Sequence, residues 1–181
     1  MSNSYQIKDQ NATYFLTFQV VGWVDVFSRK TYRDMIIESL QYCIKNKGLL
    51  VYAYVLMTNH MHLIVRSATG NLSDAIRDFK SFTSQQILKE IENNPVESRK
   101  DWMKLVFHYH AKFNKRVASQ QLWTHNNHAV ELTNAEMLDS RLNYIHENPV
   151  KAGWVDEAID YVYSSARNYA DLPGLLAIEK I

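Results

Sequence analysis

Apolar residues recur along the chain with two periods, one typical of strands and one typical of helices. Short runs rich in β-branched and aromatic residues predict strands at residues 13–21, 49–57, 60–65 and 128–132. Apolar residues spaced three and four apart predict helices at about residues 28–47, 73–93, 102–113 and 134–148. The expected N-caps are Ser28, Ser73 and Asn134, and the expected stops are Gly48, Pro95 and Pro149. In the third helix the apolar positions are Trp102, Leu105, Val106, Tyr109 and Phe113.

The order of these elements indicates the fold class. A strand, a helix, a two-strand hairpin, two helices, a strand and a final helix follow one another. This order fits an α+β, ferredoxin-like (RRM-like) core, in which helices pack against a four-stranded antiparallel sheet. We therefore expect residues 1–181 to form a single domain with its core at about residues 13–153. Residues 154–181 are expected to be a C-terminal helix or arm.

Composition and charge limit the functional classes. A chain of 181 residues suits one domain that needs no disulfide to be stable. The 20 basic and 19 acidic residues nearly cancel, so a case for DNA binding must rest on local clusters and on chemistry. Cys43 is the only cysteine, which favours a reducing, cytoplasmic setting. No apolar run approaches the ~20 residues of a membrane helix.

Two histidine pairs have the same spacing, but their predicted secondary structure separates them. Residues two apart point to the same face of a strand and diverge by ~200° on a helix. His60 and His62 lie in a predicted strand, so their imidazoles should stand side by side while Met61 points away. His108 and His110 lie in a helical pattern and should not share an ion. The first pair is a candidate metal site, although two half-buried histidines on a sheet would show the same spacing.

A second candidate constellation lies in the last predicted helix. Tyr144 and Asn148 are four residues apart, so they share one helix face at ~5–6 Å, whereas His146 points elsewhere. A phenol and a carboxamide on one face could both approach one ion, and a cation would favour the phenolate. A core tyrosine followed by a helix end before Pro149 is the alternative.

Together these segments resemble a known family. Tyr54–Val65, which contains His60-Met61-His62, resembles the HUH strand of one-tyrosine HUH transposases, in particular the REP-associated tyrosine transposases. Tyr144–Gly153 resembles the catalytic helix of that family, and Asp78–Ser84 resembles the helix between the two motifs. The similarity extends over about residues 13–165, and both motifs occur in the family's order.

The resemblance implies a fold and a mechanism. It implies a ferredoxin-like sheet with the histidine pair on a central strand. His60, His62 and Asn148 would ligate Mg²⁺ or Mn²⁺, and Tyr144 would attack a phosphate. The reaction would be cleavage and strand transfer of single-stranded, hairpin-forming DNA through a 5′-phosphotyrosine intermediate. Monomeric and homodimeric states both stay open.

Basic residues in two places are candidates for contacts with DNA phosphates. Arg77 and Lys80 lie on the predicted helix after the histidine pair, beside the proposed site, and Lys112, Lys115 and Arg116 form a second cluster. Both groups are equally consistent with solvated surface. Trp123 could stack on a base, although core packing is the commoner role of such a residue.

Two other functions fit parts of the same pattern. A metal-dependent nuclease that activates water at the histidine pair would need no tyrosine nucleophile. A non-enzymatic, RRM-like module would bind single strands through exposed aromatic residues on its sheet, and Tyr52 and Tyr54 alternate in that manner. The histidine pair serves no purpose on such a stacking platform.

Overall fold

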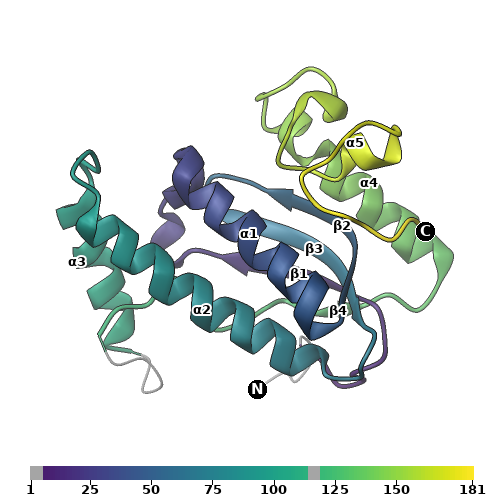
Figure 1. The fold of residues 1–181 in the computed structure, drawn as a ribbon, viewed down its shortest axis with the longest axis horizontal. Coiled ribbons are helices and arrows are strands. Elements are labelled where there is room, and N and C mark those ends of the chain that lie inside the picture. Colours follow the sequence, from purple (N-terminus) through teal and green to yellow (C-terminus); the bar gives the residue numbers. More distant parts are fainter. Residues whose placement is uncertain (1–5, 114–118) are drawn as a thin grey trace.

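A computed structural model describes residues 6–113 and 119–181 of the chain. The strands are β1 (Tyr14–Gln19), β2 (Leu49–Leu56), β3 (His60–Ser67) and β4 (Val130–Glu131). The α-helices are α1 (Lys30–Lys47), α2 (Leu72–Asn93), α3 (Lys100–Ala111), α4 (Ala135–Lys151) and α5 (Ala166–Tyr169), as labelled in Figure 1. Short 3-10 turns occupy Val21–Trp23, Val26–Ser28 and Ala158–Asp160.

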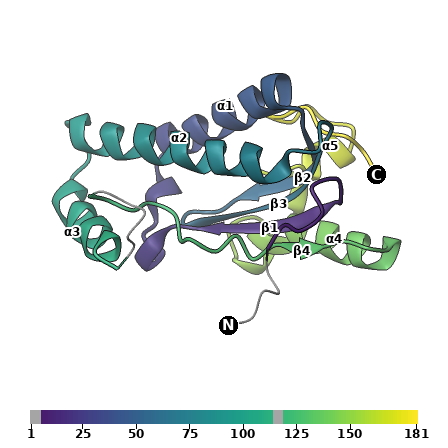
Figure 2. The ribbon, with the colours of Figure 1, turned by 90° about the horizontal axis from the view of Figure 1, so that it is seen from below.

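The described strands form one antiparallel sheet in the order β2-β3-β1-β4. Strand β3 is therefore paired on both sides, and the register places His62 opposite Thr17 of β1 and Val55 of β2. Helices α1 and α2 cover one face of the sheet and α4 crosses the other (Figure 2). The α+β, ferredoxin-like prediction is confirmed, and the histidine strand is an inner strand.

The two sheet faces carry different side chains because successive strand residues alternate. On the face toward α2, Phe18 packs on Phe79 with ring centroids 5.9 Å apart, and Met61 is fully buried. On the face toward α4, Phe15 contacts His62 and Tyr144. The apolar core therefore lies mainly under α1 and α2, and the candidate chemistry lies under α4.

Helix α3 forms as predicted but buries a different side. Met103 and Phe107 are fully buried, whereas most of the residues that set the predicted stripe are exposed. The exposed ones are Trp102, Leu105, Tyr109 and Phe113. The reason is position: α3 lies beyond the end of the sheet (Figure 1), so it packs through one side only, although apolar residues occupy both.

The predicted N-caps were correct in one of three cases. The Asn134 side chain accepts a hydrogen bond from the Met137 amide at 2.8 Å, as an N-cap should. Helix α1 instead follows Arg29 and α2 follows Asn71, and neither residue makes a capping side-chain bond. Both helices therefore begin without a side-chain cap.

The prediction that Pro149 stops the last helix was wrong. Helix α4 continues to Lys151, with Pro149 buried inside it. Proline removes a single backbone donor, and the next turn is closed by the Ala152 amide, which donates to Asn148 O at 3.0 Å. Gly153, with φ of 72°, ends the helix.

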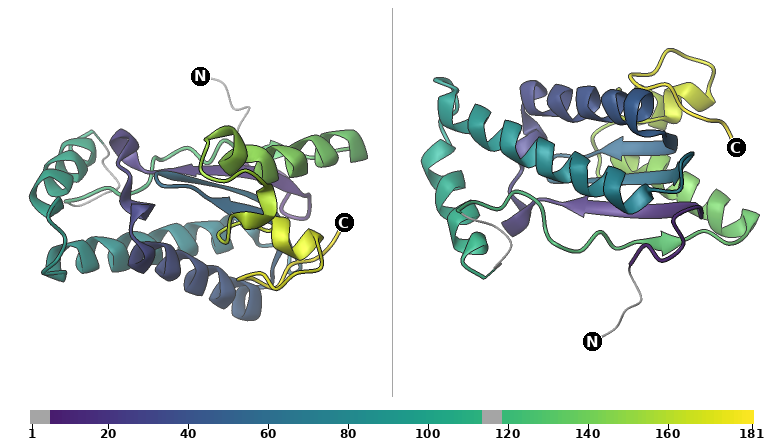
Figure 3. Two further views of the ribbon diagram at one scale, coloured as in Figure 1. Left: turned by 90° about the horizontal axis from the view of Figure 1, so that it is seen from above. Right: turned by 60° about the horizontal axis from the view of Figure 1, so that its bottom comes forward.

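The C-terminal segment, residues 154–181, contains the short helix α5 and is otherwise mostly irregular. It runs along β2 (Figure 3), where the Leu56 amide donates to Tyr163 O and the Glu179 amide donates to Val51 O, each at 2.9 Å. Helix α5 lies between these two contacts. The segment therefore covers the open edge of β2.

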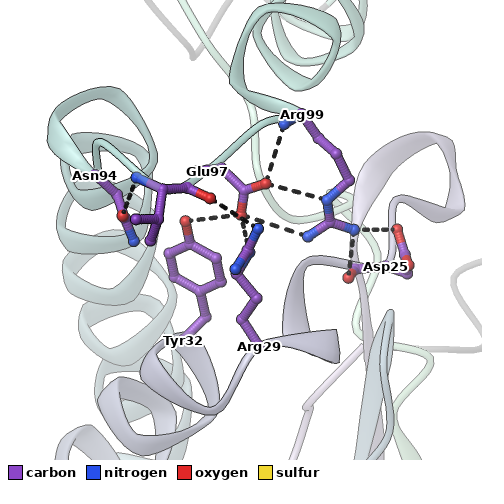
Figure 4. Close-up of polar contacts among 7 residues, drawn as sticks. Asp25, Arg29, Tyr32, Asn94, Glu97 and Arg99 are labelled. Atoms are coloured by element: carbon purple, nitrogen blue, oxygen red, sulfur yellow. Dashed lines mark hydrogen bonds and ion pairs between the residues drawn. The ribbon is translucent and has the colours of Figure 1, made fainter.

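A buried carboxylate joins the α2–α3 connection to the start of α1 (Figure 4). Glu97 forms ion pairs with Arg29 at 2.7 Å and Arg99 at 3.1 Å, and the Tyr32 hydroxyl donates to it at 3.1 Å. Burial opposes its ionisation, but the hydrogen bonds and charge of Arg99 outweigh burial and lower the pKa of Glu97. Burial, together with the Glu97 charge, raises the pKa of Tyr32 to about 12.

Candidate active site

His60 and His62 stand side by side on the face of β3 that α4 covers. Their ring centroids are 4.9 Å apart, and His62 is buried with 5% of its surface exposed. Met61 between them is buried on the opposite face. The strand geometry expected from their spacing is therefore present.

Each histidine is held through the same ring nitrogen. His60 Nδ1 lies 2.6 Å from Asn59 Oδ1, and His62 Nδ1 lies 2.9 Å from Thr17 Oγ1. The Nε2 atom of His62 is buried and has no hydrogen-bond partner among the described residues. A ring fixed through Nδ1 with a free Nε2 is the arrangement that metal-binding histidines adopt.

The site keeps both imidazoles neutral. Burial lowers the pKa of His60. Burial also lowers the pKa of His62 to about 3, and the charges of His60 and Arg141 add to this effect. A neutral imidazole is the form that can bind a metal, and the lowered pKa values favour this form of both side chains at neutral pH.

Tyr144 reaches the histidines from α4. Its ring centroid lies 5.1 Å from that of His62 and 5.9 Å from that of Phe15, both in edge-on contact. The side chain is 39% exposed, and its hydroxyl makes no hydrogen bond within residues 6–113 and 119–181. The two predicted constellations, far apart in sequence, thus meet at one place.

Asn148 lies one turn after Tyr144 on α4 and is half-buried. Within the described part of the chain, no third histidine, cysteine, aspartate or glutamate joins His60 and His62 in a metal-binding group. Asn148 offers an amide oxygen from the same helix as Tyr144. Its place as a ligand stays a prediction.

Arg141 belongs to the site and was missed by the sequence analysis. Its guanidinium carbon lies 4.9 Å from the centroid of the Phe15 ring. Phe15 in turn stacks on His62, with centroids 5.3 Å apart and an interplanar angle of 19°. Its position three residues before Tyr144, on the same helix face, was the available signal.

The other histidines contact different parts of the molecule. His146 Nε2 lies 2.9 Å from Ser165 Oγ, which ties α4 to the C-terminal segment, and burial lowers the pKa of His146 to about 4. His108 Nδ1 lies 2.6 Å from Ser119 O, and His110 packs on Tyr109. In keeping with their predicted geometry, none of these three joins the pair on β3.

The expected position of Arg77 and Lys80 beside the site was wrong. Both lie on α2, which covers the sheet face opposite α4 (Figure 2), because both helices of the α1–α2 layer pack on one side. Arg77 is exposed and pairs with Asp74 and Asp78. The Lys80 ammonium is largely sequestered; it donates to Thr124 O and to the Asn127 side chain.

Burial lowers the pKa of Lys80 to about 8, so this lysine is not a freely solvated cation. Arg77 and Lys80 nonetheless line a polar groove of about 660 Å³ between α2 and residues 119–125. Lys112 is exposed just after α3, whereas Lys115 and Arg116 lie outside the described residues. Contact of any of these with DNA stays a prediction.

Two aromatic candidates are core residues. The Trp123 indole is buried and its Nε1–H donates to Thr83 Oγ1 at 3.0 Å. Tyr54 is fully buried, so β2 presents no exposed Tyr52–Tyr54 platform for base stacking. This burial counts against the RRM-like binding module.

Comparison with known proteins shows which family the chain resembles. Residues 10–107 match the family model described as "Transposase IS200 like", a stretch that includes both histidines on β3 and ends before Tyr144. The chain is also similar to a solved "REP associates tyrosine transposase bound to a REP hairpin", with a TM-score of 0.64 and 18% identity over 100% of this chain and 94% of that one. No curated protein sequence is significantly similar to the chain.

No helix within the described residues has both the length and the hydropathy of a membrane span. The family match covers more than half of the 181 residues. The chain therefore belongs to the IS200-like transposase family, and it is an enzyme of DNA transposition.

Proposed function

We propose that this transposase cleaves and rejoins single-stranded DNA with Tyr144 as its nucleophile, beside a divalent ion held by His60, His62 and Asn148. The observation that carries the proposal is the meeting of two motifs. The Tyr144 ring lies 5.1 Å from His62, and the Nε2 atom of His62 is buried without a partner.

The residues present fit a metal ion. Two neutral imidazoles anchored through Nδ1, and an amide oxygen from Asn148, would leave positions open for water or a phosphate oxygen. Such a mixed nitrogen and oxygen set suits Mn²⁺ or Mg²⁺ with water completing the shell. When bound, the ion would polarise the scissile phosphate as a Lewis acid.

The chemistry of the protein residues is a reversible phosphoryl transfer. The Tyr144 hydroxyl gives up its proton and its oxygen attacks phosphorus. The P–O3′ bond breaks, and the departing oxygen takes up a proton to become a 3′-OH. The DNA 5′ end is then a phosphotyrosine, and attack by another 3′-OH restores the tyrosine. Bond energy is conserved, so no nucleotide cofactor is required. The exposure of Tyr144 allows solvent to accept its proton.

We propose hairpin-forming single-stranded DNA as the substrate. Two findings support this: the family is one of transposases, and a protein of similar fold is described as bound to a REP hairpin. The small net charge of +1 suggests that local contacts, not a general basic surface, would hold the DNA.

Tyr144→Phe tests the nucleophile because it removes one oxygen that makes no hydrogen bond within the described residues. Wild-type protein incubated with a labelled hairpin library and Mn²⁺ should form a covalent adduct, which mass spectrometry of the tryptic peptides should place on Tyr144. The variant should form none while it still binds metal and DNA.

Tyr163→Phe is the matched control. The three tyrosines that follow Gly153 have hydrogen-bonded hydroxyls: Tyr161 donates to Leu56 O, Tyr163 to the Asp34 carboxylate and Tyr169 to Tyr52 O. An adduct that persists in Tyr144→Phe would refute the assignment. Cleaved wild-type substrate without any adduct would favour a nuclease that activates water.

A further inference from the structure

Arg141 is a cation placed beside the proposed nucleophile. Its guanidinium lies over the Phe15 ring, and the same ring contacts both His62 and Tyr144. On α4 it precedes Tyr144 by three residues, so the two side chains leave the helix on one face at ~5–6 Å. Arg141 thus shares with His62 and Tyr144 one aromatic neighbour, Phe15.

This arginine has no acidic partner among the described residues. No ion pair there includes it, and the residues three and four positions away on α4 are uncharged. They are Met137, Leu138, Tyr144 and Ile145. Arg29 and Arg99, by contrast, are both paired with Glu97. The contact with Phe15 uses none of the five N–H donors of Arg141 in a hydrogen bond, so the fork is available to an anion.

We propose that Arg141 binds the scissile phosphate, before and after that phosphate becomes bonded to Tyr144. This inference rests on the proposed function. A guanidinium matches two phosphate oxygens at once, and the phosphate carries its highest charge in the transition state. After attack, the phosphate is bonded to Tyr144, whose position on α4 lies about one helical turn from that of Arg141. Arg141 is then a catalytic residue, and Phe15 positions it.

The test compares two proteins on two substrates. Arg141→Met keeps an unbranched side chain on Phe15 and removes the charge. A methylphosphonate at the scissile position removes one charged oxygen from the DNA. With native DNA and saturating Mn²⁺, the variant should form the Tyr144 adduct about 100-fold more slowly than wild type. With methylphosphonate DNA, the two proteins should differ by less than about 3-fold, because the interaction is already lost.

Two further variants separate charge from packing. Arg33→Met is the matched control, since the Arg33 guanidinium lies 4.4 Å from the Tyr163 ring in a comparable contact on another part of the molecule. It should leave the rate of adduct formation unchanged. Arg141→Lys keeps the charge but not the fork, and should lose about 10-fold. If circular dichroism shows that Arg141→Met is unfolded, the comparison on native and methylphosphonate DNA is made with Arg141→Lys.

Equal losses on native and methylphosphonate DNA would overturn the inference, because the arginine would then act through structure alone. An unchanged rate in Arg141→Met would overturn it as well. Either result leaves the nucleophile intact, since the adduct is still observed on Tyr144. Failure of the proposed function looks different: the wild-type protein itself would form no adduct.

Discussion

Thr17→Val is the sharpest test of how the histidine pair is held. Thr17 lies directly opposite His62 in the β1–β3 ladder, and its Oγ1 is 2.9 Å from His62 Nδ1. Valine has nearly the same shape, so packing on the strand is preserved. What is lost is the hydroxyl hydrogen-bonded to His62 Nδ1. With an ion on Nε2, that hydroxyl would accept the proton of Nδ1.

The size of the effect follows from this single contact. Loss of a hydrogen bond to a metal-binding histidine weakens metal affinity by about 10- to 100-fold, or about 1.4–2.7 kcal/mol. Because His62 is buried, water cannot easily replace the threonine hydroxyl, and we expect the upper half of that range. Isothermal titration with Mn²⁺ measures the change directly.

Thr83→Val provides the control for Thr17→Val. Thr83 is buried, whereas Thr17 is half-buried, and Thr83 accepts a hydrogen bond from a ring N–H, that of Trp123, on the α2 side of the sheet. Its variant should lose stability and keep its metal affinity. If Thr17→Val bound Mn²⁺ as tightly as wild type, the assignment of Nε2 as the metal-binding atom of His62 would be wrong.

Three further predictions follow. His62→Ala should abolish both Mn²⁺ binding and DNA cleavage, whereas His108→Ala should change neither in the same titration and adduct assay; unchanged binding in the first would remove the metal site from β3. Glu97→Gln should lower the free energy of unfolding by about 2–3 kcal/mol in urea, since it leaves Arg29 unpaired, whereas Arg99 keeps its ion pair with Asp25 and Arg29 is partly exposed. The pKa of Glu97 is lowered in the folded state, so the stability that its ionised form provides should be fully present above the ordinary glutamate pKa of 4.5. It should be lost as pH falls through the lowered pKa. If the free energy of unfolding of Glu97→Gln fell with acid in the same way as that of the wild type does, this account would be wrong. Arg77 is paired with Asp74 and Asp78 on α2, so Arg77→Ala should leave the slope of log binding constant against log salt concentration unchanged. A slope reduced by about 0.7 would show instead that Arg77 contacts a DNA phosphate.

Local spacing was sufficient to predict strands β1–β4, helices α1–α4 and the common face of the two histidines. The alternation around Met61 predicts that His60 and His62 share one face of a strand. The four-residue spacing of Tyr144 and Asn148 predicts that these two residues share one face of a helix. These inferences need only the period of a strand or a helix. The meeting of the two motifs was implied by the family resemblance, not by the spacing itself.

Contacts that depend on tertiary arrangement could not be predicted in this way. Thr17 lies opposite His62 only because of the register between β1 and β3. Arg141 lies near the site only because its guanidinium packs on the ring of Phe15, a residue of β1. Placement of α2 on the other side of the sheet depends on which face the histidines take, and a two-residue period does not specify this. The exposed stripe of α3 has a similar origin, because a helix with apolar residues on two sides does not reveal which side is covered.

The alternation along β3 places two kinds of constraint on neighbouring residues. Met61 and Leu63 are fully buried residues of the core under α1 and α2, and they are required for folding whatever the protein does. His60 and His62 face α4, and in the proposed function they serve the reaction and not the core. A descendant that kept this fold but no longer moved DNA would therefore diverge at His60 and His62 sooner than at Met61 and Leu63, and this pattern of drift would record the loss of activity.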